Sequence, residues 1–165
     1  MLIAVLSDIH DRLDHLARVL EDIRSRPCAR LFFLGDFCAP FSLNDLASGF
    51  TAGPIDCVFG NNDGDLFLLH RIAAKHPHVT LHAPLAELEI EGKAILLNHY
   101  PEIGRRLAKS GEAAAVFTGH DHQRYQHRFG AALWANPGEI MGRFGTVSYG
   151  LYDTAAHTFE HVILP

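Results

Sequence analysis

Short clusters rich in aspartate, asparagine and histidine recur at five places in this chain of 165 residues. The clusters are at residues 7–10 (SDIH), 35–36 (GD), 60–63 (GNND), 98–99 (NH) and 118–122 (TGHDH). Carboxylate oxygens, amide oxygens and neutral imidazole nitrogens are side-chain groups that bind divalent metal ions. The first chemistry that these clusters suggest is metal binding, provided that the fold brings them together.

The number of donor groups indicates more than one ion. The clusters offer four or more oxygens and four imidazoles, which is too many for one catalytic zinc ion and fits a pair of ions. A carboxylate such as that of Asp36 can bridge two cations. Mixed nitrogen and oxygen ligation suits Mn, Fe, Zn or Co, whereas calcium prefers oxygen alone. The candidate ligands are Asp8, His10, Asp36, Asn61, His99, His120 and His122.

Each cluster comes directly after a short apolar run, and such runs are typical of strands buried on both faces. The runs are at residues 2–6, 31–34, 57–59, 94–97 and 114–117. Because the carboxyl ends of parallel strands meet at one edge of a sheet, we expect the clusters to converge there. Gly35, Gly60 and Gly119 precede candidate ligands and would permit the tight turns that aim them inward.

Helical periodicity appears between these strands. Apolar residues recur at helical spacing after Asp11, which predicts a helix with Asp11 as its N-cap and Pro27 beyond its end. Residues 65–75 and 101–108 also have helical spacing, and Gly111 is placed to end the second of these helices. Strands that alternate with helices are typical of βαβ units.

The second half of the chain is richer in strands. A hairpin is predicted over residues 85–91 and 94–97, and two or three antiparallel strands over residues 129–134, 146–153 and 158–164. We therefore expect one α/β domain over residues 1–165, in which two mixed β-sheets pack face to face as a sandwich with helices outside.

Composition and charge narrow the class of protein. With 48% hydrophobic and 20% charged residues, the chain is typical of a globular protein. Fourteen Lys and Arg against nineteen Asp and Glu give a formal charge of -5, which argues against electrostatic binding to nucleic acid or a membrane surface. No apolar stretch approaches the ~20 residues that span a bilayer. Three cysteines without CxxC spacing favour a reducing, cytoplasmic location over a disulfide framework.

The order of the five clusters (DxH, GD, GNxD, a lone His and GHxH) resembles the calcineurin-like metallophosphoesterase superfamily. In its small size the chain resembles the small bacterial and archaeal phosphodiesterase branch of this superfamily. The match runs from Asp8 to His122, and residues 136–138 (NPG) resemble a further signature of that branch.

The resemblance implies a metal-dependent phosphoesterase that hydrolyses phosphodiesters or small phosphomonoesters. One ion would be held by Asp8, His10, Asp36 and His122, and the other by Asp36, Asn61, His99 and His120. It implies two divalent ions, with Mn expected and Zn, Fe, Ni or Co as alternatives, and attack on phosphorus by a hydroxide that bridges them. The catalytic group would be Asp36, Asn61, His99, Asn62 and Asp63.

Three positions depart from the pattern of the superfamily. Asn62 stands where many members have a histidine, and an amide cannot supply a proton to the leaving group. Either water protonates the departing oxygen or good leaving groups are favoured. Tyr100 replaces a common glycine and could line or narrow the pocket. Glu139 replaces a small hydroxylic residue and would repel phosphate if it faced the site.

Two other functions are compatible with a fold of this type. A non-catalytic, metal-binding interaction scaffold is the main alternative, because the same fold resembles that of a retromer subunit that works through protein contacts. A nuclease acting on long nucleic acid is disfavoured because the sequence shows no basic groove. Arg105, Arg106 and Lys109 fall on one side of a predicted helix and are explained as a solvated face. The expected partner is a small phosphorylated substrate, with no membrane and no indication of the oligomeric state.

Overall fold

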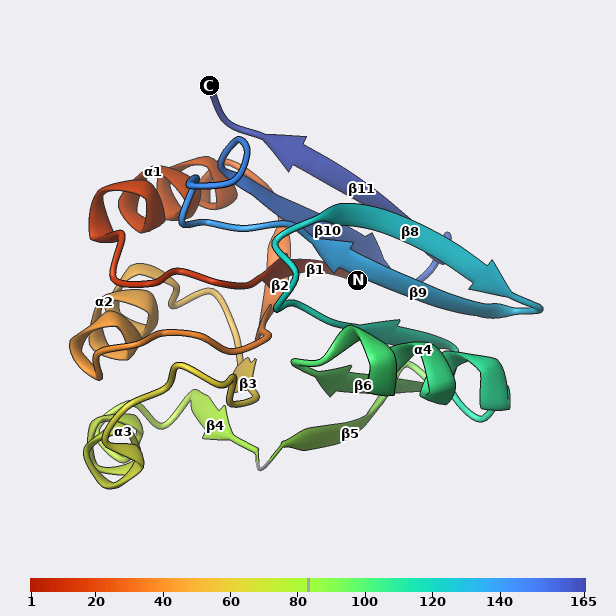
Figure 1. The fold of residues 1–165 in the computed structure, drawn as a ribbon, viewed down its shortest axis with the longest axis horizontal. Helices are drawn as coiled ribbons and strands as arrows, with labels where there is room; N and C mark the ends of the chain where they lie inside the picture. Colours follow the sequence, from red (N-terminus) through yellow and green to blue (C-terminus); the bar gives the residue numbers. More distant parts are fainter. Residues whose placement is uncertain (83) are drawn as a thin grey trace.

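A computed structural model describes residues 1–82 and 84–165 of the chain. In this part of the chain two β-sheets pack face to face, and helices cover both outer faces (Figure 1). The predicted α/β sandwich of two mixed sheets with outer helices is confirmed.

The first sheet has the strand order β11-β10-β1-β2-β3-β4. Its strands are β1 (Leu2–Leu6), β2 (Cys28–Phe33), β3 (Ile55–Cys57), β4 (Val79–Leu81), β10 (Ser148–Asp153) and β11 (Thr158–Ile163). Strands β1 to β4 are parallel, whereas β10 pairs with β1 and β11 in antiparallel fashion.

The second sheet has the order β5-β6-β7-β9-β8. Its strands are β5 (Leu85–Ile90), β6 (Lys93–Asn98), β7 (Ala115–Phe117), β8 (Arg124–Phe129) and β9 (Ala132–Pro137). Strands β6, β7 and β9 are parallel, and the edge strands β5 and β8 are antiparallel to their neighbours. The hairpin predicted near Gly92 is the β5–β6 pair and is confirmed.

The helices cover the two sheets unequally. Helices α1 (Leu13–Arg24), α2 (Phe41–Gly49) and α3 (Leu66–Ala73) lie beside the first sheet, and α4 (Pro101–Ser110) lies on the second (Figure 1). Gly104 allows α4 to approach closely, since a Cβ there would lie 2.2 Å from Cγ2 of Thr118 in the loop after β7.

Three hydrophobic layers hold these parts together. Strand β1 illustrates the alternation: Ala4 and Leu6 pack toward the helices, while Ile3 and Val5 face the second sheet. The layer between the sheets includes Phe32 and Phe117, which are both fully buried. A smaller layer around Trp134 joins α4 to the second sheet. Burial on both faces explains why β1 is a continuous apolar run.

Two local predictions were wrong. Arg12 occupies the N-cap of α1 without a side-chain cap, and the Asp11 carboxylate instead accepts hydrogen bonds from the Ala39 amide and the Ser42 hydroxyl. The strand predicted over residues 129–134 is interrupted by a turn at Gly130, which has a positive φ of 60° and joins β8 to β9.

Helix α2 and strand β4 were not predicted from the sequence. Helix α2 contains Ser, Asn and Gly, which have weak helix propensity, so tertiary packing of Leu43 and Leu46 accounts for it. Strand β4 has three residues and is too short to show a period. In the described ranges, no helix is both long and apolar enough to cross a membrane. Cys28, Cys38 and Cys57 are free thiols.

Candidate metal centre

The loops that follow β1, β2, β3, β6 and β7 meet at the carboxyl ends of these strands. Backbone hydrogen bonds join them: the Asp8 amide donates to the Gly35 carbonyl at 3.1 Å, and the Gly119 amide donates to the His99 carbonyl at 3.0 Å. The first bond joins the loops that follow β1 and β2, and the second joins the loops that follow β6 and β7. The sequence clusters therefore converge at one edge of the sandwich, as predicted.

These loops depart from ordinary backbone geometry at the candidate ligands. Residues other than glycine rarely adopt positive φ, and such strain is concentrated at functional sites. Five of the seven candidate ligands have φ between 44° and 74°. They are Asp8, His10, Asp36, His120 and His122. The turns direct their side chains into the space between the loops.

Asp36 lies at the middle of the cluster and is 1% exposed. Its Oδ2 is 3.4 Å from Nε2 of His10 and 3.5 Å from Nε2 of His99. The Asn62 amide N–H donates to Oδ1 and the Asn62 side chain donates to Oδ2, both at 2.8 Å. Burial raises the pKa of Asp36, but hydrogen bonds from His99 and Asn62 outweigh it and hold the pKa well below its usual range. Asp36 is therefore an ionised carboxylate positioned between two imidazoles.

His99 is fully buried and has a fixed orientation. Its Nδ1 is 2.7 Å from the Leu34 carbonyl, which can only accept, so Nδ1 carries a proton and donates it. Its Nε2 faces the oxygen atoms of Asn61, at 3.1 Å, and of Asp36. Burial lowers the pKa of His99, but the nearby carboxylates Asp36 and Asp8 outweigh it and raise the pKa.

His122 has the same arrangement on the other side of the cluster. Its Nδ1 is 2.7 Å from Oε2 of Glu139, and its Nε2 is 3.7 Å from Oδ1 of Asp8. Glu139 is 1% exposed, and its second oxygen accepts from the Phe144 and Gly145 amides at 2.7 and 2.9 Å. Glu139 thus holds the candidate ligand His122 in place.

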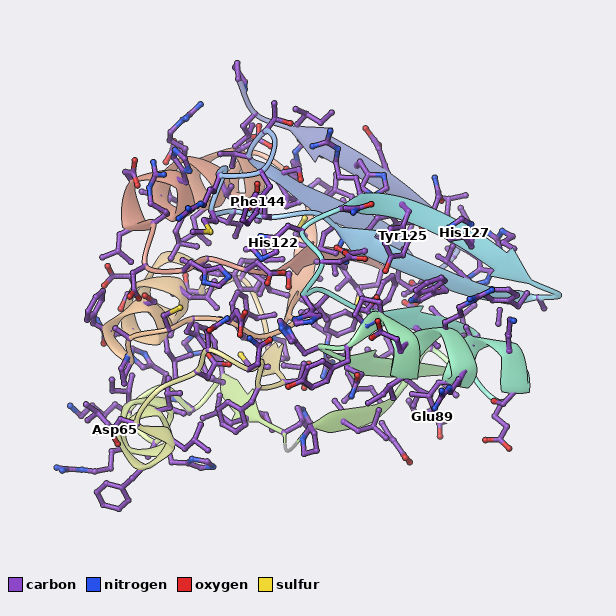
Figure 2. The ribbon with its side chains drawn as sticks, in the orientation of Figure 1. Asp65, Glu89, His122, Tyr125, His127 and Phe144 are labelled. Carbon is purple, nitrogen blue, oxygen red and sulfur yellow. The ribbon has the colours of Figure 1, made fainter. Side chains whose placement is uncertain are left out.

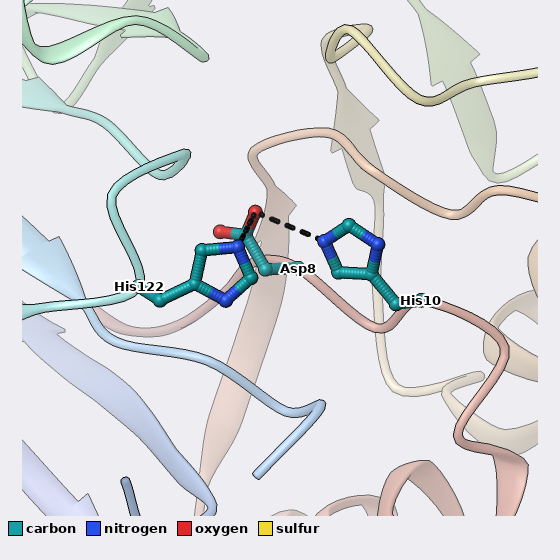
Figure 3. Close-up of side chains that lie close together, drawn as sticks. All are labelled: Asp8, His10 and His122. Carbon is teal, nitrogen blue, oxygen red and sulfur yellow. Dashed lines mark ion pairs between the residues drawn. The ribbon is translucent and has the colours of Figure 1, made fainter. Parts of the chain in front are cut away.

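His10 completes the set. Its Nδ1 lies 3.2 Å from Sγ of Cys38, and its Nε2 faces Oδ1 of Asp8 at 3.7 Å (Figure 3). The nearby carboxylates of Asp8 and Asp36 raise the pKa of His10 against the effect of burial. Its ring also stacks on that of His122, with centroids 5.1 Å apart. Cys38 contacts the far nitrogen of His10, so it supports the imidazole and is not itself directed at the carboxylates.

The donor set fits a cation. Each of these three imidazoles has its Nδ1 occupied by the protein and turns its Nε2 toward carboxylate oxygens. Asp8 Oδ1 and His10 Nε2 are buried atoms with no hydrogen-bond partner among residues 1–82 and 84–165. Such atoms are costly to bury unless a ligand satisfies them. Two groups have ligand atoms close enough to share an ion: Asp8 with His10 and His122, and Asp8 with Asp36 and His99.

His120 and Asn61 lie beside these groups. The His120 amide donates to Oδ2 of Asp8 at 3.1 Å, and its ring centroid is 5.0 Å from that of His99. Asn61 contacts Nε2 of His99, as described above. The structure thus brings together all seven side chains that the sequence indicated. Tyr100 lies over the same rings, with centroids 5.2 Å from both His99 and His120.

The Asp63 side chain supports the loops through hydrogen bonds from backbone amides. Its Oδ2 accepts from the Gly60 and Asp36 amides at 2.7 and 3.1 Å, and its Oδ1 accepts from the Phe37 amide at 2.6 Å. Burial raises the pKa of Asp63, although these hydrogen bonds oppose it. Gly60 faces Asp36 so closely that a Cβ there would lie 2.1 Å from Oδ1. Asp63 is therefore a positioning residue.

The fold and the site define an α/β protein of metallophosphoesterase type. The sequence matches the family model described as the calcineurin-like phosphoesterase superfamily domain over residues 1–157, and the chain belongs to this superfamily. The family implies divalent metal ions.

Three of the matches each cover nearly the whole chain. The chain is 25% identical over 167 residues to a phosphodiesterase of Methanocaldococcus jannaschii, covering 99% of each. The solved structure of an archaeal phosphodiesterase has a TM-score of 0.90 at 25% identity and covers 99% of this chain and 100% of that one. Vps29 of Chaetomium thermophilum shares the fold, with a TM-score of 0.70 at 16% identity over 99% of this chain and 95% of that one.

Proposed function

We propose that this chain is a binuclear-metal phosphodiesterase acting on small phosphorylated substrates. One ion would be held by Asp8, His10, Asp36 and His122, and the second by Asp36, Asn61, His99 and His120, with Asp36 shared. The proposal rests chiefly on one observation: Asp8 Oδ1 and His10 Nε2 are buried, face each other at 3.7 Å and lack any partner among the described residues.

When bound, two divalent ions supply charge neutralisation at phosphate and a water of lowered pKa as nucleophile. Mixed nitrogen and oxygen ligation favours Mn, with Zn, Fe, Ni or Co as alternatives. The contribution of the chain is to direct Nε2 of His99 and of His122 inward. Leu34 and Glu139 do this by accepting the Nδ1 proton of His99 and of His122.

Asn62 bears on the choice of substrate. Its backbone and side-chain N–H groups both donate to Asp36, so the residue orients the shared carboxylate. Since an amide cannot protonate a departing alkoxide, we propose that aryl or nucleoside-phosphate esters, whose leaving groups need little protonation, are preferred.

Hydrolysis of bis(4-nitrophenyl) phosphate, with elemental analysis of the purified protein, tests the function. We expect close to two ions per chain and Mn-stimulated release of nitrophenol, which His99→Ala should abolish. His70→Ala is the matched control, because His70 is exposed on α3. Unchanged hydrolysis in the folded His99→Ala variant would refute the proposed phosphodiesterase function.

A non-catalytic scaffold is the second candidate, because the Vps29 fold is similar. A scaffold would bind metal without turnover. If the protein binds two ions yet hydrolyses neither aryl diesters nor aryl monoesters with Mn, Zn, Fe, Ni or Co, the scaffold is favoured.

A further inference from the structure

The outer face of the second sheet carries a groove that the metal centre does not explain. Two adjoining hollows of about 390 and 430 Å³ lie there and share Arg105 and Trp134 in their walls. Helix α4 forms one side, and strands β8 and β9 form the other. Both volumes fall in the range of roughly 300–1,000 Å³ that is typical of small-molecule sites.

The helix side of the groove is strongly basic. Arg105, Arg106 and Lys109 are exposed on α4 and line the first hollow, and Arg128 of β8 lines the second. Glu102 is the acidic residue in these walls. The three cations of α4 against one carboxylate give a local positive potential despite the overall charge of -5, while the Arg128 guanidinium donates to the His157 carbonyl. The α4 cations that the sequence analysis explained as a solvated face thus line one wall of this groove.

The strand side of the groove is aromatic. Tyr125, His127 and Phe129 alternate along β8 and so share one face, where each packs beside Trp134 of β9. His127 is exposed and stacks on Trp134, with ring centroids 5.5 Å apart and an interplanar angle of 30°. Rings that stack outward in this way offer a flat apolar surface for a further ring.

Contacts between neighbouring side chains link the walls of the groove to the loops of the metal centre. The Tyr125 and Thr118 hydroxyls are 3.4 Å apart, and Trp134 Nε1 donates to Thr118 at 3.0 Å. Thr118 is two residues before the candidate ligand His120. Figure 2 shows Tyr125 and then His127 leading away from His122 along β8. At the other wall, Pro101 of α4 directly follows Tyr100, which covers His99 and His120.

A groove that combines cations with aromatic rings is the chemistry that proteins use to bind single-stranded nucleic acid without strong sequence preference. The length also fits: Pro101 to Lys109 spans ~12 Å at 1.5 Å per residue, room for about three stacked nucleotides at 3.4 Å each. We propose that this groove binds the end of a short single-stranded oligonucleotide and leads its terminal phosphodiester to the metal centre.

This substrate class rests on the proposed phosphodiesterase function, but binding can be measured separately from turnover. Trp134 is the single tryptophan of the chain and lies in the groove wall, so its fluorescence reports occupancy. A short oligothymidylate is titrated into the protein in EDTA to prevent cleavage. We expect saturable quenching that weakens with salt, because phosphate contacts release counterions.

A base-free probe tests the aromatic wall. An abasic deoxyribose-phosphate oligomer of equal length and charge should bind roughly tenfold more weakly, since stacking contributes to affinity for every base. His127→Ala should weaken oligothymidylate binding by a similar factor. Equal binding of the two oligomers, or tighter binding of an acidic peptide, would overturn the proposal in favour of a purely electrostatic or a protein-binding groove.

Charge variants test the basic wall. Arg105→Gln should weaken oligothymidylate binding several-fold and reduce the salt dependence by about one phosphate contact. Arg71→Gln is the matched control, because Arg71 is exposed on α3, beside the other sheet. Equal effects of the two variants would contradict the groove.

Kinetics with Mn then separate the two proposals. Arg105→Gln should raise KM for oligothymidylate several-fold while leaving hydrolysis of bis(4-nitrophenyl) phosphate unchanged. Oligonucleotide binding without hydrolysis of either compound would refute the phosphodiesterase function and leave the groove standing. Hydrolysis of the aryl diester without saturable Trp134 quenching would refute the groove alone.

Discussion

Glu139 and His122 form a pair in which Oε2 of the buried carboxylate lies 2.7 Å from Nδ1 of the imidazole. Because the carboxylate also accepts from two backbone amides through Oε1, it fixes both the ring of His122 and the loop that carries Phe144. Phe144 itself is exposed and meets the His122 ring edge-on, with centroids 5.2 Å apart.

Glu139→Gln should weaken metal binding by about 10- to 100-fold while the protein stays folded. A glutamine has one acceptor oxygen, so it cannot accept from both His122 and the Phe144 and Gly145 amides as the carboxylate does. Isothermal titration with Mn measures the affinity, and circular dichroism checks the fold. Wild-type affinity in this variant would contradict the role given to Glu139.

Metal addition should stabilise the protein. Ions that bind only the folded chain at 100 times their Kd contribute about 2.7 kcal/mol, which corresponds to a rise in Tm of roughly 5–10 °C for a chain of this size. Thermal unfolding followed with and without Mn measures the rise, and EDTA should reverse it. In Asp8→Asn, which keeps the shape of the side chain, the rise should be much smaller.

Asp63→Asn should destabilise the fold by about 1–3 kcal/mol, because one carboxylate oxygen becomes an NH2 group that faces backbone donors. Those donors are the amides of Gly60, Asp36 and Phe37. Urea unfolding measures the loss. Asp65→Asn, which alters the N-cap of α3 and keeps an acceptor for the Leu68 amide, is the control and should cost less.

Leaving-group dependence tests the role of Asn62. Rates for a series of phosphodiesters should fall steeply as the pKa of the leaving alcohol rises, so alkyl diesters should be much slower than aryl diesters. Asn62→His should flatten this dependence by supplying a proton donor. Equal turnover of alkyl and aryl diesters by the wild type would count against the preference.

A pH-dependent contribution to stability comes from Asp22 at the end of α1. Burial raises the pKa of Asp22, but hydrogen bonds from the Tyr149 hydroxyl and Arg26 outweigh it and lower the pKa. Because the pKa of Asp22 is lower in the folded state, the ionised carboxylate stabilises the fold above the ordinary carboxyl pKa of ~3.9. This stabilisation is lost as the pH falls through the pKa of the folded state. The difference in urea midpoint between wild type and Asp22→Asn should therefore shrink from neutral pH to about pH 3.

The sequence predicted the convergence of the site because each candidate ligand directly follows a buried strand, and parallel strands bring their ends together. Asp36 shows this: its motif, its burial and its place beside His10 and His99 all agree. What supports the ligands could not be predicted in the same way. Glu139 and Leu34 meet His122 and His99 only through tertiary contacts, and a residue that offers a backbone carbonyl, as Leu34 does, leaves no trace in side-chain type.

Predictions of local structure were wrong where a contact with a residue distant in the sequence outweighed the local sequence pattern. Asp11 has the residue type of an N-cap, yet its carboxylate bonds with Ala39 and Ser42 near the start of α2. The role of the basic face of α4 could not be predicted from the sequence either, because the sequence does not show that β8 and β9 place aromatic rings across from Arg105.

The candidate ligands come from both layers of the sandwich: Asp8, His10 and Asp36 extend from the first sheet, and His99 and His122 from the second. Cations bound there would therefore cross-link the two sheets at one end of the sandwich. Ion loading should slow amide hydrogen exchange in loops of both sheets together, and depletion of the ions should make that end the first to open under proteolysis.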